Sequence, residues 1–139
     1  MADRYWVGGT GSWGATTTNW SATSGGASGA SVPTSADDVF FDILSTGTCT
    51  IASANAKSID CTGFTGTIAG TSAITVSGSI TLSAVMTYTH SGTVIINGTG
   101  TLTTAGKTFS PLTINGSGIT VTLGDNLTSS GTITVSQGT

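Results

Sequence analysis

Three aspartates lie close together in the first third of the sequence: Asp37, Asp38 and Asp42. Two carboxylates facing each other across a sugar-binding cleft are the catalytic pair of glycosidases, and clustered carboxylate oxygens bind Ca²⁺. The chain has no Glu, however, and too few aromatic residues outside its N-terminal region to line a sugar-binding groove. We therefore expect Asp37 and Asp38 to cap a turn by accepting backbone N–H bonds, with a Ca²⁺ site as the alternative and no catalytic role.

Two other residues could take part in chemistry. Gly106-Lys107-Thr108 matches the end of a phosphate-binding loop, but the motif requires Gly where this chain has Thr101, and no helix is expected to follow. Lys107 is therefore expected at a solvated corner. His90 is the single histidine, and no nucleophile pattern lies near it, so we expect an exposed residue at the end of a strand. These residues predict no enzyme and no cofactor.

The two cysteines, Cys49 and Cys61, lie in stretches that alternate like strands. No C-x-x-C motif or Cys/His cluster is present, so a metal site is not expected. The N-terminus has no apolar segment of a secretory signal, and we therefore expect two reduced, buried thiols. A disulfide between them is the alternative.

Composition limits the partners. Charged residues make up 6% of the chain and the net charge is −3, so the basic stripe of a nucleic-acid-binding protein is missing. No apolar run approaches the length of a membrane span, and no membrane partner is expected. Thr, Ser and Gly take the surface positions that Lys and Glu occupy in most domains, while apolar residues reach 37%. This composition indicates a β protein with a hydroxyl-rich solvent face.

A short pattern recurs from Ala73 to Thr139: alternating apolar and hydroxyl residues, then a small polar residue, then Gly. A fainter copy precedes it at Ser58-Ile59-Asp60-Cys61-Thr62-Gly63. The positions that anchor its copies are Cys61, Val76, Ile96, Ile114 and Val135, which are 15, 20, 18 and 21 residues apart. A recurrence of this length is typical of repeat proteins, in which each unit buries its apolar face against its neighbours.

The pattern predicts an all-β fold with no helix. In a parallel β-solenoid, coils of about 19 residues would stack and the five anchors would form one interior column as the solenoid core. An antiparallel β-sandwich is the alternative, with hairpin turns at Asn97-Gly98 and Asn115-Gly116. We favour the solenoid because the anchors recur in the same order and the same inward phase.

Two regions are expected. Residues 1–45 form an N-terminal capping or attachment segment, and residues 46–139 form the Thr/Gly-rich repeat region, continued by more chain or by a partner. The predicted cap consists of three tryptophans, the aspartate pair and one phenylalanine: Trp6, Trp13, Trp20, Asp37, Asp38 and Phe40. Positions 127–139 contain no charge and no Pro, so the last coil should offer an adhesive edge. A homo-oligomer, plausibly a trimer, would cover it.

The N-terminal region resembles the leader of Thr/Gly-rich repeat proteins of tailed-phage virions. The resemblance rests on four motifs: Trp6-Val7-Gly8-Gly9-Thr10-Gly11-Ser12-Trp13, Asn19-Trp20-Ser21, Val32-Pro33 and Ala36-Asp37-Asp38-Val39-Phe40-Phe41-Asp42. A looser version of the leader is similar to the start of β-helical, autotransporter-like bacterial adhesins. The phage resemblance covers essentially the whole chain and carries no catalytic residues. Within the repeats it includes Lys57-Ser58-Ile59-Asp60-Cys61-Thr62-Gly63-Phe64 and Leu112-Thr113-Ile114-Asn115-Gly116.

The resemblance implies a non-enzymatic structural protein of a phage virion, such as a tail fibre or a capsid or tail decoration protein. It would be assembled in the host cytoplasm with other virion proteins, and a glycan of the host surface is a candidate ligand. The first alternative is a secreted, cell-surface β-helical adhesin, which the missing export signal disfavours. The second is a carbohydrate-binding module, in which exposed tryptophans would bind sugar.

Overall fold

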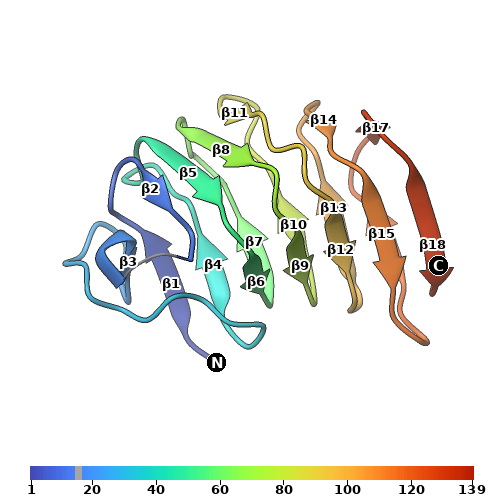
Figure 1. Ribbon diagram of the computed structural model, residues 1–139, viewed down its shortest axis with the longest axis horizontal. Coiled ribbons are helices and arrows are strands. Elements are labelled where there is room, and N and C mark those ends of the chain that lie inside the picture. The colour runs from blue at the N-terminus through green and yellow to red at the C-terminus, as the bar shows by residue number, and fades with distance from the viewer. Residues whose placement is uncertain (15–16) are drawn as a thin grey trace.

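The chain forms a parallel β-solenoid of about five turns, which confirms the predicted fold class. The structure is a computed structural model that describes residues 1–14 and 17–139. Short strands stack coil upon coil along one axis, with the N-terminus at one end of the stack and β18 at the other (Figure 1). Apart from one antiparallel pair at the N-terminal end, every pairing between the described strands is parallel. The antiparallel sandwich is therefore excluded.

Three faces enclose the core, and from β4 (Asp38–Phe40) onward the chain visits them in the order A, B, C in each coil. Face A is a seven-stranded sheet with the order β16-β13-β10-β7-β4-β1-β3. Its strands are β1 (Asp3–Trp6), β3 (Trp20–Ser21), β4 (Asp38–Phe40), β7 (Ser58–Asp60), β10 (Ile80–Thr81), β13 (Gly100–Thr103) and β16 (Val121–Leu123).

Face B consists of two sheets. The first is β2 (Gly11–Ser12), β5 (Thr48–Ile51), β8 (Thr67–Gly70) and β11 (Thr87–Tyr88), and the second is β14 (Thr108–Phe109) with β17 (Thr128–Ser129). Face C is one sheet of five strands: β6 (Ala54–Ala56), β9 (Ile74–Val76), β12 (Val94–Ile96), β15 (Leu112–Asn115) and β18 (Ile133–Gln137).

The interior column on face C contains four of the five predicted anchors. Val76, Ile96, Ile114 and Val135 are paired in succession on β9, β12, β15 and β18. Cys61 lies in the core as predicted, but its predicted place in this column is wrong, because the residue that precedes Val76 in the column is Ala56. Cys61 follows β7 on face A, where it is fully buried. Its distance of 15 residues from Val76 is shorter than a coil, and an alanine in the true position gives no apolar signal.

The glycine that ends each repeat permits close stacking of coils. A Cβ on Gly78 would lie 2.9 Å from the carbonyl oxygen of Lys57, and one on Gly116 would lie 2.8 Å from that of Asn97. At Gly98 a Cβ would overlap the carbonyl oxygen of Ser77. Each of these glycines therefore lets a corner lie directly on the backbone of the preceding coil, where no side chain fits.

Coil length is nearly constant, but the shape of the coil changes along the stack. Successive face A partners Val39, Ile59, Ile80, Leu102 and Leu123 are 20 to 22 positions apart. From face A through face B to face C, the chain uses 15 positions between Val39 and Ala54 but 10 between Leu102 and Leu112. The return from face C to face A lengthens from 5 positions after Ala54 to 11 after Leu112.

The N-terminal segment is part of the stack as well as its cover. β1 pairs with β4 in parallel, and β3 folds back to pair with β1 in antiparallel, which ends face A at this side. The described residues include one short 3₁₀ turn, η1 (Thr17–Asn19), just before β3. Residues 22–37 then run along the N-terminal end of the solenoid to β4 (Figure 1). The predicted boundary between residues 45 and 46 lies within a coil, between β4 and β5.

The core is a continuous apolar cluster that runs from the tryptophans of the first coil to Leu112. The thiols of Cys49 and Cys61 are free and buried within it. Burial raises the pKa of both thiols because it disfavours the charged thiolate. Both cysteines therefore act as small apolar core residues.

Candidate functional site

The three tryptophans form a closed cluster at the N-terminal end of the core. Trp6, Trp13 and Trp20 are all fully buried. The ring of Trp20 meets those of Trp6 and Trp13 edge to face, at centroid distances of 5.2 and 4.9 Å. Phe41 lies on the inner side, within 6.0 Å of each indole, and contacts Phe64 of the next coil. The cluster therefore closes the stack and offers no indole surface to a ligand.

Two of the three indole N–H groups fix loops of this end. Trp6 Nε1 donates to the carbonyl oxygens of Gly9 (2.9 Å) and Thr46 (3.1 Å). Trp20 Nε1 donates to the carbonyl oxygen of Trp13 at 3.0 Å. The buried Nε1 of Trp13 has no hydrogen-bond partner among the described residues.

Phe40, predicted as part of the cap, lies on the other side of the strand. Along β4 the side chain of Val39 points inward, so Phe40 points outward and Phe41 points inward again. The ring of Phe40 is half-buried on the outer surface of face A, where it stacks on Tyr5 at a centroid distance of 4.8 Å. The aromatic residue that completes the cap is Phe41, and the period of two along Asp38–Phe41 is the signal that identifies it.

Asp37 closes the turn that leads into β4. Its carboxylate accepts hydrogen bonds from the backbone N–H of Ala2 (2.9 Å), the backbone N–H of Thr34 (3.0 Å) and the hydroxyl of Thr34 (2.8 Å). Burial raises the pKa of this carboxyl, but these bonds and the charge of Arg4 outweigh burial, so the pKa is lowered overall. Asp37 thus ties the N-terminal residues to the segment that crosses the end of the stack.

The side chain of Asp38 faces outward and forms an ion pair with Lys57. Its carboxylate lies 2.9 Å from Lys57 Nζ and accepts a short hydrogen bond from the hydroxyl of Ser58, its register partner on β7. Burial raises the pKa of Asp38, and the bonds from Ser58 and Lys57 lower it to a net value below the ordinary one. The two carboxylates therefore have separate partners and do not form a paired acid and base.

His90 was expected at an exposed strand end, and this prediction is wrong. Its side chain is only 4% exposed. The imidazole lies at the corner between faces B and C, where Nε2 is 2.8 Å from the carbonyl oxygen of Ser72 and Nδ1 is 3.1 Å from the hydroxyl of Ser110. The hydroxyl of Tyr88 is 3.2 Å from Nδ1. His90 was misjudged because its polar partners come from neighbouring coils, 18 and 20 positions away.

The His90 cluster contains a serine and a histidine but lacks the features of a nucleophilic site. Ser110 is completely buried, so its hydroxyl cannot meet a substrate. The bond from His90 Nε2 is to a backbone carbonyl rather than to a carboxylate that could stabilise an imidazolium. The arrangement is a buried hydrogen-bond network that joins coils.

Lys107 and Asp125 lie half-buried at corners between faces A and B. Lys107 Nζ donates to the carbonyl oxygen of Ala84, one coil earlier, at 2.8 Å. The carboxylate of Asp125 accepts from the backbone N–H groups of Thr104 (2.8 Å) and Ala105 (2.6 Å). These backbone bonds lower the pKa of Asp125. Both side chains therefore satisfy backbone groups of the preceding coil.

Face B carries a row of threonines in equivalent outward positions. Thr48 pairs with Thr67, Thr67 pairs with Thr87, and Thr108 pairs with Thr128. Such rows of hydroxyl side chains take the place of charged residues on the surface, as the composition indicates.

The coil at the β18 end exposes apolar side chains that continue interior columns. Leu123 follows Leu102 on face A, while Ile133 and Val135 follow Leu112 and Ile114 on face C. Their exposed fractions are 52%, 46% and 54%. The prediction that Val135 belongs to the core is therefore corrected: its column is right, but the side chain lies at an open rung.

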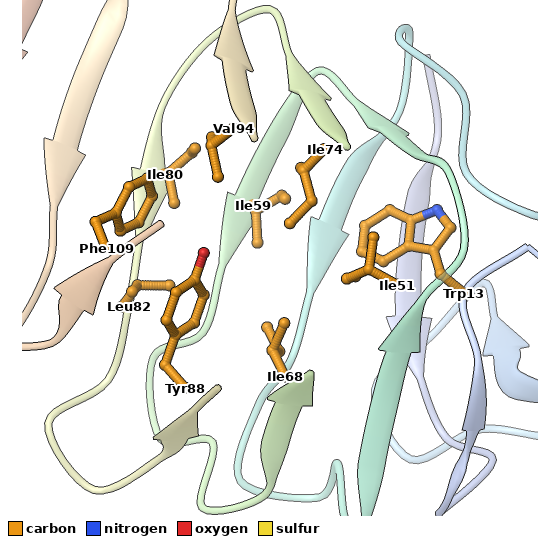
Figure 2. Close-up of a pocket in the computed structure, with 10 residues that line it drawn as sticks. All are labelled: Trp13, Ile51, Ile59, Ile68, Ile74, Ile80, Leu82, Tyr88, Val94 and Phe109. Carbon is orange, nitrogen blue, oxygen red and sulfur yellow. The ribbon is translucent and has the colours of Figure 1, made fainter. Parts of the chain in front are cut away.

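One cavity lies inside the solenoid, lined by Trp13, Tyr88, Phe109 and seven aliphatic residues of successive coils (Figure 2). Its volume is about 10 Å³. A space of this size holds at most one water molecule, and an apolar lining offers water few partners. The cavity is a packing gap in the core rather than a ligand site.

Within the described residues, no group of three or more His, Cys, Asp or Glu side chains could hold a metal ion. Among those residues there is also no helix long and apolar enough to span a membrane. Comparison of the chain with family models, with curated proteins and with solved structures returned no match.

Proposed function

We propose that this chain is a non-enzymatic structural protein of a phage particle, a tail fibre or a capsid or tail decoration protein. The observation that carries the proposal is a parallel solenoid with a closed N-terminal end and exposed faces that bear Thr and Ser hydroxyls. Such a stack is rigid because every coil except the two at the ends is hydrogen-bonded to two others, and rigidity is what a fibre or a decoration requires.

The leader supports the same proposal. The motifs that resemble phage virion proteins supply the three buried tryptophans, Asp37 and Phe41, which together close the end of the stack. These residues thus have a structural use that a virion protein and a free adhesin would share. We prefer a phage virion protein to an adhesin because the resemblance to the phage proteins extends through the repeats.

The open rung at β18 supports a homo-oligomer, with a trimer as the expected form. β18 is exposed along all five residues, and Leu123, Ile133 and Val135 present apolar side chains beside unpaired strand edges. Exposed strand edges without charge pair readily with other chains. Further chain beyond this rung, a second copy or another virion protein would bury this surface.

The burial of all three tryptophans argues against a carbohydrate-binding module that uses them. Recognition of sugar by aromatic stacking requires an exposed ring face, and these indoles are 0% exposed. A glycan of the host surface would have to bind another part of the chain.

The test is to locate the protein in particles. Phage particles from the host that produces this chain would be purified on a density gradient, and their proteins identified by quantitative mass spectrometry. We expect the chain to co-sediment with the major capsid and tail proteins at a fixed stoichiometry. Recovery only from the medium or from the cell surface would contradict the proposal and favour the adhesin.

A further inference from the structure

The backbone ladder of face B is interrupted between β11 and β14. β11 is the last strand of one sheet, and β14 begins a separate two-stranded sheet, whereas faces A and C continue across the same two coils. The interruption coincides with a change in loop length. Six positions separate Tyr88 from Val94 in one coil, but only three separate Phe109 from Leu112 in the next.

Side chains connect the two coils where the ladder is missing. The rings of Tyr88 and Phe109 are stacked at a centroid distance of 5.5 Å with their planes 5° apart. Beside them, His90 contacts Ser72 of the preceding coil through Nε2 and Ser110 of the following coil through Nδ1. One imidazole therefore holds three successive coils together at this corner.

A neutral ring satisfies both hydrogen bonds of His90. The carbonyl oxygen of Ser72 can only accept, so Nε2 carries the proton and Nδ1 accepts from the hydroxyl of Ser110 or Tyr88. Protonation would turn Nδ1 from an acceptor into a donor, so these hydroxyls would have to reorient, and it would place a charge in a site that is 4% exposed. We infer that the junction of β11 and β14 is a pH-sensitive joint of the solenoid, which neutral His90 holds closed and protonated His90 opens.

Among the described residues, none of the groups that hydrogen-bond to His90 carries a charge that could compensate an imidazolium. Tyr88 is the titratable group that contacts it, and burial raises the pKa of Tyr88 to about 12, so this phenol stays neutral. Ser72 and Ser110, from the coils on either side, are uncharged. Burial lowers the pKa of His90, and the bond to Ser72 offsets this only in part. An open junction would return the ring to water and to its ordinary pKa of about 6.5.

The sign of the effect follows from these directions. The closed junction binds fewer protons than the open one below pH of about 6.5, so acid favours opening. Between that pH and the lower pKa of the closed state, the opening constant should rise by up to about tenfold per pH unit.

Hydrogen exchange followed by mass spectrometry tests this in the full chain. Peptides covering 87–92 and 108–112 would be compared with one covering 38–51, at pH 7.5 and pH 5.5, after correction for intrinsic exchange rates. We expect the protection of the junction peptides to fall more than that of the reference peptide, by up to about tenfold. A uniform change along the chain, or none, would overturn the inference.

Two variants assign the effect to the imidazole. His90→Gln keeps a neutral donor and acceptor but cannot titrate, so the difference between the two pH values should disappear at the junction. Ser91→Ala, at the same corner and exposed, should retain it. Because His90 is the only histidine, its NMR titration in the wild type gives an independent result: a midpoint at or above 6.5 would also overturn the inference.

Discussion

Val76 and Ile96 lie directly beside each other on neighbouring parallel strands of face C, and both side chains are almost completely buried. Ile96 also pairs with Ile114 on its other side, so it lies in the middle of an interior column. Ile96→Asp would place an unpaired carboxylate in this column. We expect a loss of about 4 kcal/mol or more in the free energy of unfolding, enough to unfold much of the stack.

The neighbouring residue on the same strand provides the control. Ile95 points outward between Thr75 and Thr113 and is half-buried. Ile95→Asp should cost about 1 kcal/mol or less. Urea unfolding followed by circular dichroism would measure both variants, and equal losses would contradict the assignment of the inward column.

The indole N–H groups predict an order among tryptophan variants. Trp6→Phe removes the donor to Gly9 and Thr46 and leaves two carbonyl groups with fewer partners. Trp13→Phe removes a buried N–H that has no partner within the described part of the chain, which offsets some of the lost packing. We expect Trp6→Phe to be more destabilising by about 1 to 2 kcal/mol. Thermal and chemical unfolding of the two variants would test this order, which a larger loss for Trp13→Phe would reverse.

Asp37 should make the N-terminal end sensitive to acid. A carboxyl whose pKa is lowered on folding stabilises the fold above its unfolded value, about 3.9, and this contribution is lost as the pH falls through the lower folded value. Asp37→Asn should therefore destabilise the chain by about 2 kcal/mol at pH 7, and this loss should become smaller as the pH falls below about 3.9. Asp3→Asn, at an exposed position of β1, should have little effect at either pH. A loss for Asp37→Asn that is the same at pH 7 and in acid would contradict the role of the charge.

The proposed oligomer can be dissociated at the open rung. Val135→Lys introduces a charge among the exposed apolar side chains of this rung, whereas Thr134→Lys places the same charge on the outward side of β18. We expect the 139-residue chain to sediment as a defined oligomer, Val135→Lys as a monomer, and Thr134→Lys like the wild type. A wild-type chain that stays monomeric at high concentration would contradict the proposed assembly.

The solenoid could be predicted because the apolar anchors recur about once per coil, and this period is the strongest signal in the sequence. Val76, Ile96, Ile114 and Val135 follow this period, and the stack forms along them. Ala56 could not be identified as a member of the column because its small side chain gives no apolar signal in the sequence. The larger Cys61 lies nearby and was chosen in its place. The assignment of Phe40 to the cap could have been corrected from the sequence. Side chains alternate along a strand, so an inward Val39 places Phe40 outside and Phe41 in the interior.

The His90 network could not be predicted from local sequence. Its partners Ser72 and Ser110 are ordinary members of a Ser/Thr-rich chain, and they meet the imidazole only because the coils stack. The interruption of face B depends on a difference of three positions between two loops, which is smaller than the uncertainty of strand limits in a sequence. Long-range contacts between coils therefore determine the features that most distinguish this chain from a uniform repeat.

The near-constant coil length has a consequence for how such a chain can change during evolution. Between the first and last coils, positions are lost on the way through face B and gained on the return to face A, so the perimeter stays at 20 to 22 residues while the cross-section is reshaped. A deletion at one corner is thus compatible with stacking when an insertion at another corner of the same coil restores the perimeter. Selection can remodel one outer surface of the rod in this way and leave the interior columns in register.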